Sequence, residues 1–123
     1  MSETHRDIEK AAGQMLMAGF EGSDPEPPEA IAEALREGRI GGTILFSRNV
    51  EDLDQVVALN RRLHELAAEG GQRPLVAIDQ EGGPVMRLRE GMTPIPPMRE
   101  VGEAGAPSYI ADVSQVIAGE LRA

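Results

Sequence analysis

Two short runs of strand-forming residues, separated by an amphipathic stretch, most constrain the fold of this chain. The first run is RIGGTILF at 39–46, and the second is PLVAID at 74–79. Short runs bounded by glycine and polar residues are typical of buried strands, and continuous apolarity favours parallel strands covered on both faces. Between them, residues 51–68 repeat apolar side chains at the spacing of one helix face. The order strand, helix, strand therefore predicts a parallel βαβ unit.

The flanking segments predict further helices and two proline-rich loops. Residues 4–18 carry an apolar helix face that should end at Gly19, with Met15 and Met17 as core residues. A loop at 21–28 and a helix at 28–37 should follow. After the second strand, a loop at 91–107 leads to a last amphipathic helix from Pro107, a residue suited to a first helical position. Residues 1–123 are expected to form one domain of α/β class.

Charge and composition narrow the classes of partner. The 12 basic and 21 acidic side chains leave a formal charge of −9. This balance argues against nucleic acid, because proteins that bind its phosphates need a basic surface. The chain has no cysteine, and His5 and His64 have no second ligand at metal spacing. We therefore predict no metal and no cofactor.

The apolar segments are too short for a membrane protein. No stretch approaches the roughly 20 apolar residues of a transmembrane helix, so no membrane partner is expected. The polar N-terminus, MSETHRDIEK, lacks the apolar run of a signal peptide. The sequence therefore predicts a cytoplasmic protein.

Polar side chains follow both predicted strands at their carboxyl ends, where parallel α/β folds bind ligands. Asp79 ends the second strand, and the segment 46–49 (FSRN) ends the first. Asp79 is equally suited to accept hydrogen bonds from the following turn. Asp79 and Glu81 would lie about 6.6 Å apart in an extended strand, close to the carboxyl separation of inverting glycosidases, although such pairs are also common on solvated edges.

The segment after Asp79 leaves further alternatives open. Gly82 and Gly83 are compatible with a phosphate-binding loop, but a tight turn with positive φ is the favoured interpretation, because no phosphate-loop pattern completes the motif. Arg87 and Arg89 are either ligand-binding or solvated. The segment TPIPPM is either a polyproline ligand or, more simply, a rigid loop.

Two stretches, GGTILFSRN at 41–49 and AIDQEGGPVMRLR at 77–89, resemble the family 3 glycoside hydrolases. The resemblance is to the cytoplasmic bacterial β-N-acetylhexosaminidases that remove N-acetylglucosamine from peptidoglycan fragments. GQMLMAGFEG, REGRIGG and the closing GELRA fit the same pattern, so the resemblance covers nearly the whole chain. The chain departs from the pattern at Pro84, where the family usually has arginine, and at Met86, where it commonly has glutamine.

The resemblance implies an incomplete (β/α)₈ barrel, whose first βα units supply two parallel strands with flanking helices. It implies that Asp79 and Arg87 bind the hydroxyls of N-acetylglucosamine. The aspartate nucleophile and the His/Asp acid–base pair of a retaining mechanism have no counterpart in residues 1–123, so no catalytic residue is assigned.

The alternative function is a non-catalytic protein that binds an amino sugar or completes a half-barrel with another chain. The open edges of a short parallel sheet favour self-association or a complementing chain as partner.

Overall fold

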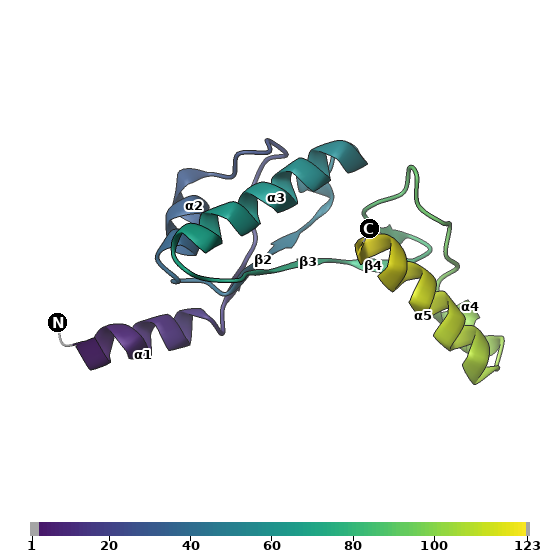
Figure 1. The fold of residues 1–123 in the computed structure, drawn as a ribbon. Helices are drawn as coiled ribbons and strands as arrows, with labels where there is room; N and C mark the ends of the chain where they lie inside the picture. Colours follow the sequence, from purple (N-terminus) through teal and green to yellow (C-terminus); the bar gives the residue numbers. More distant parts are fainter. Residues whose placement is uncertain (1–2, 123) are drawn as a thin grey trace. The chain divides into compact units, whose positions relative to one another are not determined.

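The computed structural model describes residues 3–122, which form an α/β fold (Figure 1). Their contacts separate them into two compact units, the first ending at Ile78 and the second beginning at Asp79. The elements of the first unit are α1 (Glu3–Gly13), β1 (Met17–Ala18), α2 (Glu29–Arg36), β2 (Gly42–Leu45), the 3-10 helix η1 (Ser47–Asn49), α3 (Leu53–Glu69) and β3 (Leu75–Ile78). The elements of the second unit are β4 (Gln80–Gly82), β5 (Val85–Met86), α4 (Met98–Glu103) and α5 (Pro107–Arg122).

The sheet of the first unit is parallel and has the strand order β1-β2-β3. Thr43 in the middle strand lies opposite Ala18 of β1 and Val76 of β3. The predicted βαβ unit, formed by β2, α3 and β3, is therefore confirmed. Strand β1 adds a third strand that the apolar pattern did not predict, because two residues are too few to show a period.

Helices α2 and α3 cover one face of β2 and β3 (Figure 1). Side chains alternate between the faces of a strand, so Leu45, Val76 and Ile78 point to the helices, while Leu75 points away and is 70% exposed. Within the first unit, the sheet is therefore covered on one face, whereas the sequence predicted cover on both. The buried core residues are Phe20, Ala32, Leu35, Leu45, Leu59, Leu63, Leu66 and Ala67.

The first helix is shorter than predicted. It ends at Gly13. A Cβ at residue 13 would lie 2.4 Å from the carbonyl oxygen of Gly38, so the close approach of the two backbones requires glycine there. The chain then extends, and the Gly41 N–H donates to the Leu16 carbonyl at 2.8 Å as β1 begins beside β2. Met15 is 86% exposed and Met17 is 43% exposed, so the prediction that they fill the core is wrong.

The second unit contains a hairpin and two helices around a small apolar core. Strands β4 and β5 are antiparallel, and α5 begins at Pro107 as predicted. The predicted loop at 91–107 is interrupted by α4, whose Val101 is 2% exposed. Among the described residues, no helix is both long enough and apolar enough to cross a bilayer. The core of this unit consists of Met86, Ile95, Val101 and Val113, with Ile117 packed against them.

Candidate functional site

The candidate site is the short loop and hairpin that follow β3. Asp79 comes directly after the last residue of β3, and the chain then enters the β4–β5 hairpin. Gly82 and Gly83 both have positive φ, at 92° and 54°, which only glycine adopts without strain. The favoured prediction of a tight glycine turn is therefore confirmed. The turn reverses the chain and returns Arg87 towards Asp79.

The proline-rich segment packs directly against this turn. A Cβ at Gly82 would lie 2.3 Å from the Pro96 carbonyl oxygen, and one at Gly83 would lie 2.6 Å from Pro97 Cγ. The Gly83 N–H donates to the Ile95 carbonyl at 2.7 Å. The two glycines are therefore needed for close packing, and part of TPIPPM covers the turn as a loop.

Asp79 and Arg87 form an ion pair at this edge. Arg87 Nη2 donates to Asp79 Oδ2 at 3.3 Å, and the two side chains are 25% and 37% exposed for Arg87 and Asp79 respectively. Both groups are thus shielded in part but still reach solvent. The sequence placed these two residues in the candidate site, and the structure brings them together.

The pair leaves hydrogen-bonding capacity unused. Within residues 3–122, the bond to Asp79 is the hydrogen bond that the Arg87 guanidinium makes, and its Nε is buried without an acceptor. A buried donor without a partner costs about 1 to 3 kcal/mol, so stability alone does not explain this arrangement. Arg87 Nη1 and Asp79 Oδ1 remain as an adjacent donor and acceptor. Such a pair is complementary to a sugar, whose hydroxyls both donate and accept.

The neighbouring charged residues do not share this arrangement. Arg89 Nη2 donates to the carbonyl oxygens of Gly83 and Pro84, at 3.3 and 3.0 Å, so it braces the turn. Glu81 is exposed and forms no hydrogen bond or ion pair with the described residues. Because Asp79 is committed to Arg87, the paired-acid hypothesis gains no support. In the described part of the chain, no three or more His, Asp or Glu side chains gather as metal ligands would.

The candidate residues after β2 hold two loops of the first unit together. Asn49 is fully buried, and its Nδ2 donates to the carbonyls of Phe20 and Gly22 at 3.0 and 2.7 Å. Its Oδ1 accepts from the Phe46 N–H at 2.9 Å. Arg48 stacks over the Phe46 ring at 4.6 Å and also donates to Phe20. These contacts give Arg48 and Asn49 a structural role within their unit.

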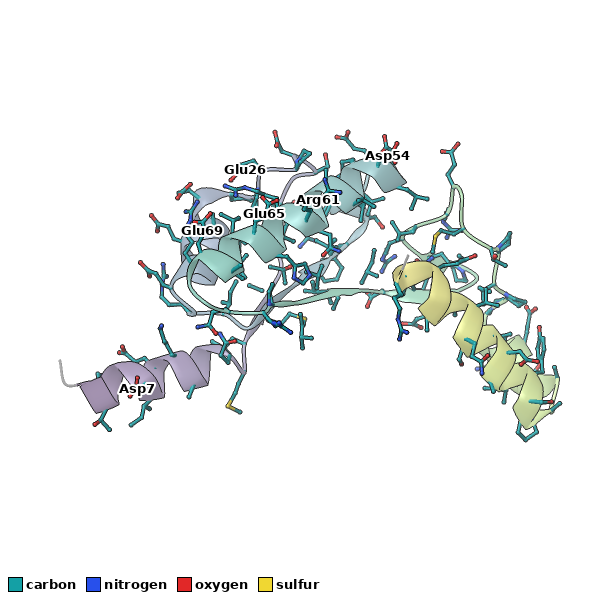
Figure 2. The ribbon with its side chains drawn as sticks, viewed as in Figure 1. Asp7, Glu26, Asp54, Arg61, Glu65 and Glu69 are labelled. Atoms are coloured by element: carbon teal, nitrogen blue, oxygen red, sulfur yellow. The ribbon has the colours of Figure 1, made fainter. Side chains whose placement is uncertain are left out.

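A shallow hollow of about 380 Å³ lies along α3 in the first unit, and Figure 2 shows Glu26, Arg61 and Glu65 beside it. Arg62 donates to Glu26 Oε2 at 2.6 Å, and this hydrogen bond holds the pKa of Glu26 below its ordinary value. Arg62 also lies 3.6 Å from Glu65. On the wall of the hollow, Arg62 and its acidic partners therefore already satisfy one another. Its lining residues are Asp24, Pro25, Glu26, Ala58, Arg61, Arg62 and Glu65.

One polar residue of the site was missed at the sequence level. Gln80 is 9% exposed, and its side chain bonds the backbone of Arg87 and Leu88. A glutamine directly after an apolar strand and before a glycine turn was the available signal. Its importance could not be recognised, because the hairpin that brings residues 80 and 87 together was not predicted.

The sequence and structure have clear relatives. Residues 7–123 match the family described as "Glycosyl hydrolase family 3 N terminal domain". The beta-hexosaminidase of Methylobacillus flagellatus is 43% identical over 96 residues, which are 72% of this chain and 26% of that protein. The beta-hexosaminidase of Bordetella avium is 41% identical over 102 residues, which are 77% of this chain and 28% of that protein. The chain thus spans about a quarter of the length of these relatives.

Solved structures show the same relationship. A glycoside hydrolase family 3 beta-N-acetylglucosaminidase from Paenibacillus sp. str. FPU-7 matches with a TM-score of 0.83 and 35% identity, over 94% of this chain and 22% of that one. NagZ from Neisseria gonorrhoeae, in complex with N-trifluoroacetyl-D-glucosamine, matches with a TM-score of 0.72 and 31% identity, over 87% of this chain and 32% of that one. The parallel strands and their helices correspond to the opening βα units of a barrel. On this evidence, the chain belongs to the N-terminal domain family of the family 3 glycoside hydrolases.

Proposed function

We propose that residues 1–123 form the opening part of the barrel domain of a β-N-acetylhexosaminidase, and that Asp79 and Arg87 bind the terminal N-acetylglucosamine of its substrate. The observation that carries this proposal is the ion pair itself. Asp79 directly follows strand β3, and its pair with Arg87 is partly exposed, with a donor and an acceptor unused. Ligands of this fold bind at the carboxyl ends of the strands.

The pair suits binding better than bond cleavage. Retaining hydrolysis needs a nucleophile and a second group that protonates the leaving oxygen. Asp79 Oδ2 accepts a hydrogen bond from the Arg87 guanidinium at 3.3 Å, so the side chain already serves as an acceptor in this pair. In the proposal, Asp79 accepts from a sugar hydroxyl while Arg87 Nη1 donates to a neighbouring oxygen. The cleaving groups belong to parts of the enzyme outside these 123 residues.

The names of the relatives support the substrate class. Proteins that match this chain are called beta-hexosaminidases, and one matching structure holds an N-acylated glucosamine, N-trifluoroacetyl-D-glucosamine. We extend the proposal to peptidoglycan fragments as the source of the sugar and to the cytoplasm as the location. Cell fractionation, followed by assay of muropeptide cleavage in extracts, tests both extensions.

The binding proposal is tested by calorimetric titration of the purified chain with N-acetylglucosamine. Asp79→Ala and Arg87→Lys should abolish the heat of binding, because lysine cannot present the planar guanidinium that contacts both Asp79 and the sugar. Glu81→Ala is the matched control, because it removes the neighbouring acid without touching the pair. Equal binding by Asp79→Ala and Glu81→Ala would refute the proposal.

Catalysis needs a separate assay. The purified chain should not hydrolyse an aryl N-acetylglucosaminide, since the cleaving groups are proposed to lie outside it. Turnover that follows the chain through purification, and that Asp79→Ala removes, would contradict the division between binding and cleavage.

A second candidate function is assembly with another chain through the sheet edges. Within the described residues, β1 and β3 each pair with β2 alone. Met17 on β1 and Leu75 on β3 are 43% and 70% exposed, so both outer strands carry apolar surface. Unpaired strand edges of this kind associate readily. Light scattering over a concentration series should show a mass above the 13.2 kDa monomer, and a monomer at all concentrations would refute this candidate.

A further inference from the structure

The side-chain amide of Gln80 hydrogen-bonds the backbone of Arg87 and Leu88, which have no partner strand among the described residues. The β4–β5 ladder ends at Met86, where Gln80 and Met86 lie opposite each other. Beyond that point the chain continues through Arg87 without a backbone ladder. The side chain of Gln80 takes over: its Oε1 accepts from the N–H groups of Arg87 and Leu88, at 2.9 and 3.1 Å, and its Nε2 donates to the Leu88 carbonyl at 2.7 Å.

These contacts need a side-chain amide. Gln80 is 9% exposed, so backbone groups that lost its bonds would find little water in exchange. The three bonds require an acceptor with two lone pairs and a donor on the same planar group, which is the inventory of glutamine. A carboxylate would supply the acceptor but would face the Leu88 carbonyl with like charge. A thioether would supply neither interaction at useful strength.

The rest of the hairpin is fixed independently of Gln80. The Gly83 N–H is bound by the Ile95 carbonyl at 2.7 Å, and Arg89 braces Gly83 and Pro84. The turn is therefore held by its own contacts, whereas the backbone at residues 87–88 depends on Gln80. Gln80 directly follows Asp79 in the chain, and its side chain bonds the backbone of Arg87, so it is linked to both members of the ion pair.

We propose that Gln80 is a positioning residue: it does not touch the sugar, and it holds the backbone of Arg87 so that the guanidinium meets Asp79. This inference rests on the proposed sugar site for its biological meaning. Its physical content, the dependence of the Arg87 guanidinium on Gln80, can be measured without any sugar.

The test follows the Arg87 Nε–H by ¹⁵N nuclear magnetic resonance in the full chain. In the wild type this proton should exchange with water at least about tenfold more slowly than that of exposed Arg99, because Arg87 Nε is buried. Gln80→Met keeps the side-chain length and removes all three bonds. It should raise the Arg87 exchange rate to near the Arg99 rate, while α5 amides remain protected.

Asn49→Leu is the matched control. Asn49 is another buried amide with three bonds to backbone, but it belongs to the first unit. Asn49→Leu should lower the hydrogen-exchange protection of α3 amides and leave the exchange rate of the Arg87 Nε–H unchanged. If the loss of any buried amide loosened the whole chain, Asn49→Leu and Gln80→Met would instead accelerate Arg87 exchange equally. If Gln80→Met unfolds the second unit, Gln80→Glu decides: it should still accelerate Arg87 exchange, because its carboxylate faces the Leu88 carbonyl.

Unchanged Arg87 exchange in a folded Gln80 variant would overturn the inference, whatever the sugar result. The opposite outcome is also informative. If the Arg87 Nε–H is protected in the wild type and loses protection in Gln80→Met, but the wild type does not bind N-acetylglucosamine, the positioning role stands and the proposed function is refuted. When both hold, Gln80→Met should weaken sugar binding by about tenfold or more with Asp79 and Arg87 unaltered in sequence.

Discussion

Replacing Gly82 with alanine should disrupt the hairpin that carries the candidate site, and Gly22 offers a matched control. The two glycines have similar positive φ, 92° at Gly82 and 100° at Gly22. They differ in their surroundings. A Cβ at Gly22 would meet nothing within 4 Å, while one at Gly82 would lie 2.3 Å from the Pro96 carbonyl oxygen and 2.8 Å from Ile95 Cγ2. Comparing the two substitutions separates backbone strain from close packing.

The magnitudes follow from these two contributions. Holding alanine in a sparsely populated φ region costs about 1 to 3 kcal/mol, which applies to both sites. Overpacking adds about 1 to 3 kcal/mol at Gly82 alone, since the nearest atom belongs to backbone and cannot rotate away. Gly82→Ala should therefore destabilise the second unit by about 2 to 6 kcal/mol, and Gly22→Ala the first unit by about 1 to 3 kcal/mol.

Native-state hydrogen exchange measures each unit separately, which a single melting curve does not. Amides of α5 report the free energy of opening of the second unit, and amides of α3 report that of the first. Gly82→Ala should lower protection in α5, and Gly22→Ala should lower protection in α3 by a smaller amount. Equal losses for the two substitutions would refute the argument that the Pro96 contact requires glycine at residue 82.

Three further outcomes test other contacts. Thr43→Val should leave the free energy of unfolding in urea unchanged or raise it by up to about 1 kcal/mol, because Thr43 Oγ1 is buried with no hydrogen-bond partner among the described residues. A clear loss of stability would show that the hydroxyl is hydrogen-bonded. Arg62→Gln should raise the pKa of Glu26 towards its ordinary value of 4.5, as followed by carboxyl ¹³C titration. Because the pKa of Glu26 is lowered in the folded state, the stabilisation from Glu26 is present above its unfolded pKa and is lost as pH falls through its folded pKa. In Arg62→Gln this loss of stability at low pH should shrink. An unaltered titration of Glu26 would contradict its pairing with Arg62. Leu75→Lys should reduce association in light scattering by placing a charge on the exposed outer strand, and an unchanged mass would exclude β3 as the contact.

The central fold was predictable because its elements carry strong, long patterns. The short runs that became β2 and β3 are bounded by turn residues, and α3 repeats buried leucines, including Leu59, Leu63 and Leu66, over 17 residues. Gly38, with φ of 70°, follows α2 where the sequence predicted a stop. In these segments local preference and tertiary packing favour the same structure.

The misplaced elements are short or depend on distant contacts. The apolar face of the first predicted helix continued to Leu16, but the helix ends at Gly13, where the backbone packs closely against the Gly38 carbonyl. Strand β1 exists because it pairs with β2, and α4 exists because Val101 reaches the core of the second unit. None of these contacts is visible in a local window of sequence.

The site was predictable in part. The apolar pattern placed Asp79 at the end of a strand. The assignment of Arg87 to the same site came from the family resemblance, because the spacing of the two residues does not indicate that they meet. The ion pair requires a hairpin that reverses the chain between them, and that hairpin depends on Gly82 packing under Pro96. The role of Gln80 follows only from the resulting geometry, because its three bonds reach seven or eight residues along the chain.

The most direct test of the central claim is a titration of the ¹⁵N-labelled chain with N-acetylglucosamine, observing arginine side-chain resonances. We expect the Arg87 guanidinium signals to shift in a saturable way, while those of Arg61, in the hollow along α3, and Arg89, on the turn, stay in place. Asp79→Asn should abolish the Arg87 shift. Saturable shifts at Arg61 with Arg87 unmoved, or no shift at any arginine at saturating sugar, would contradict the claim that this edge binds the sugar.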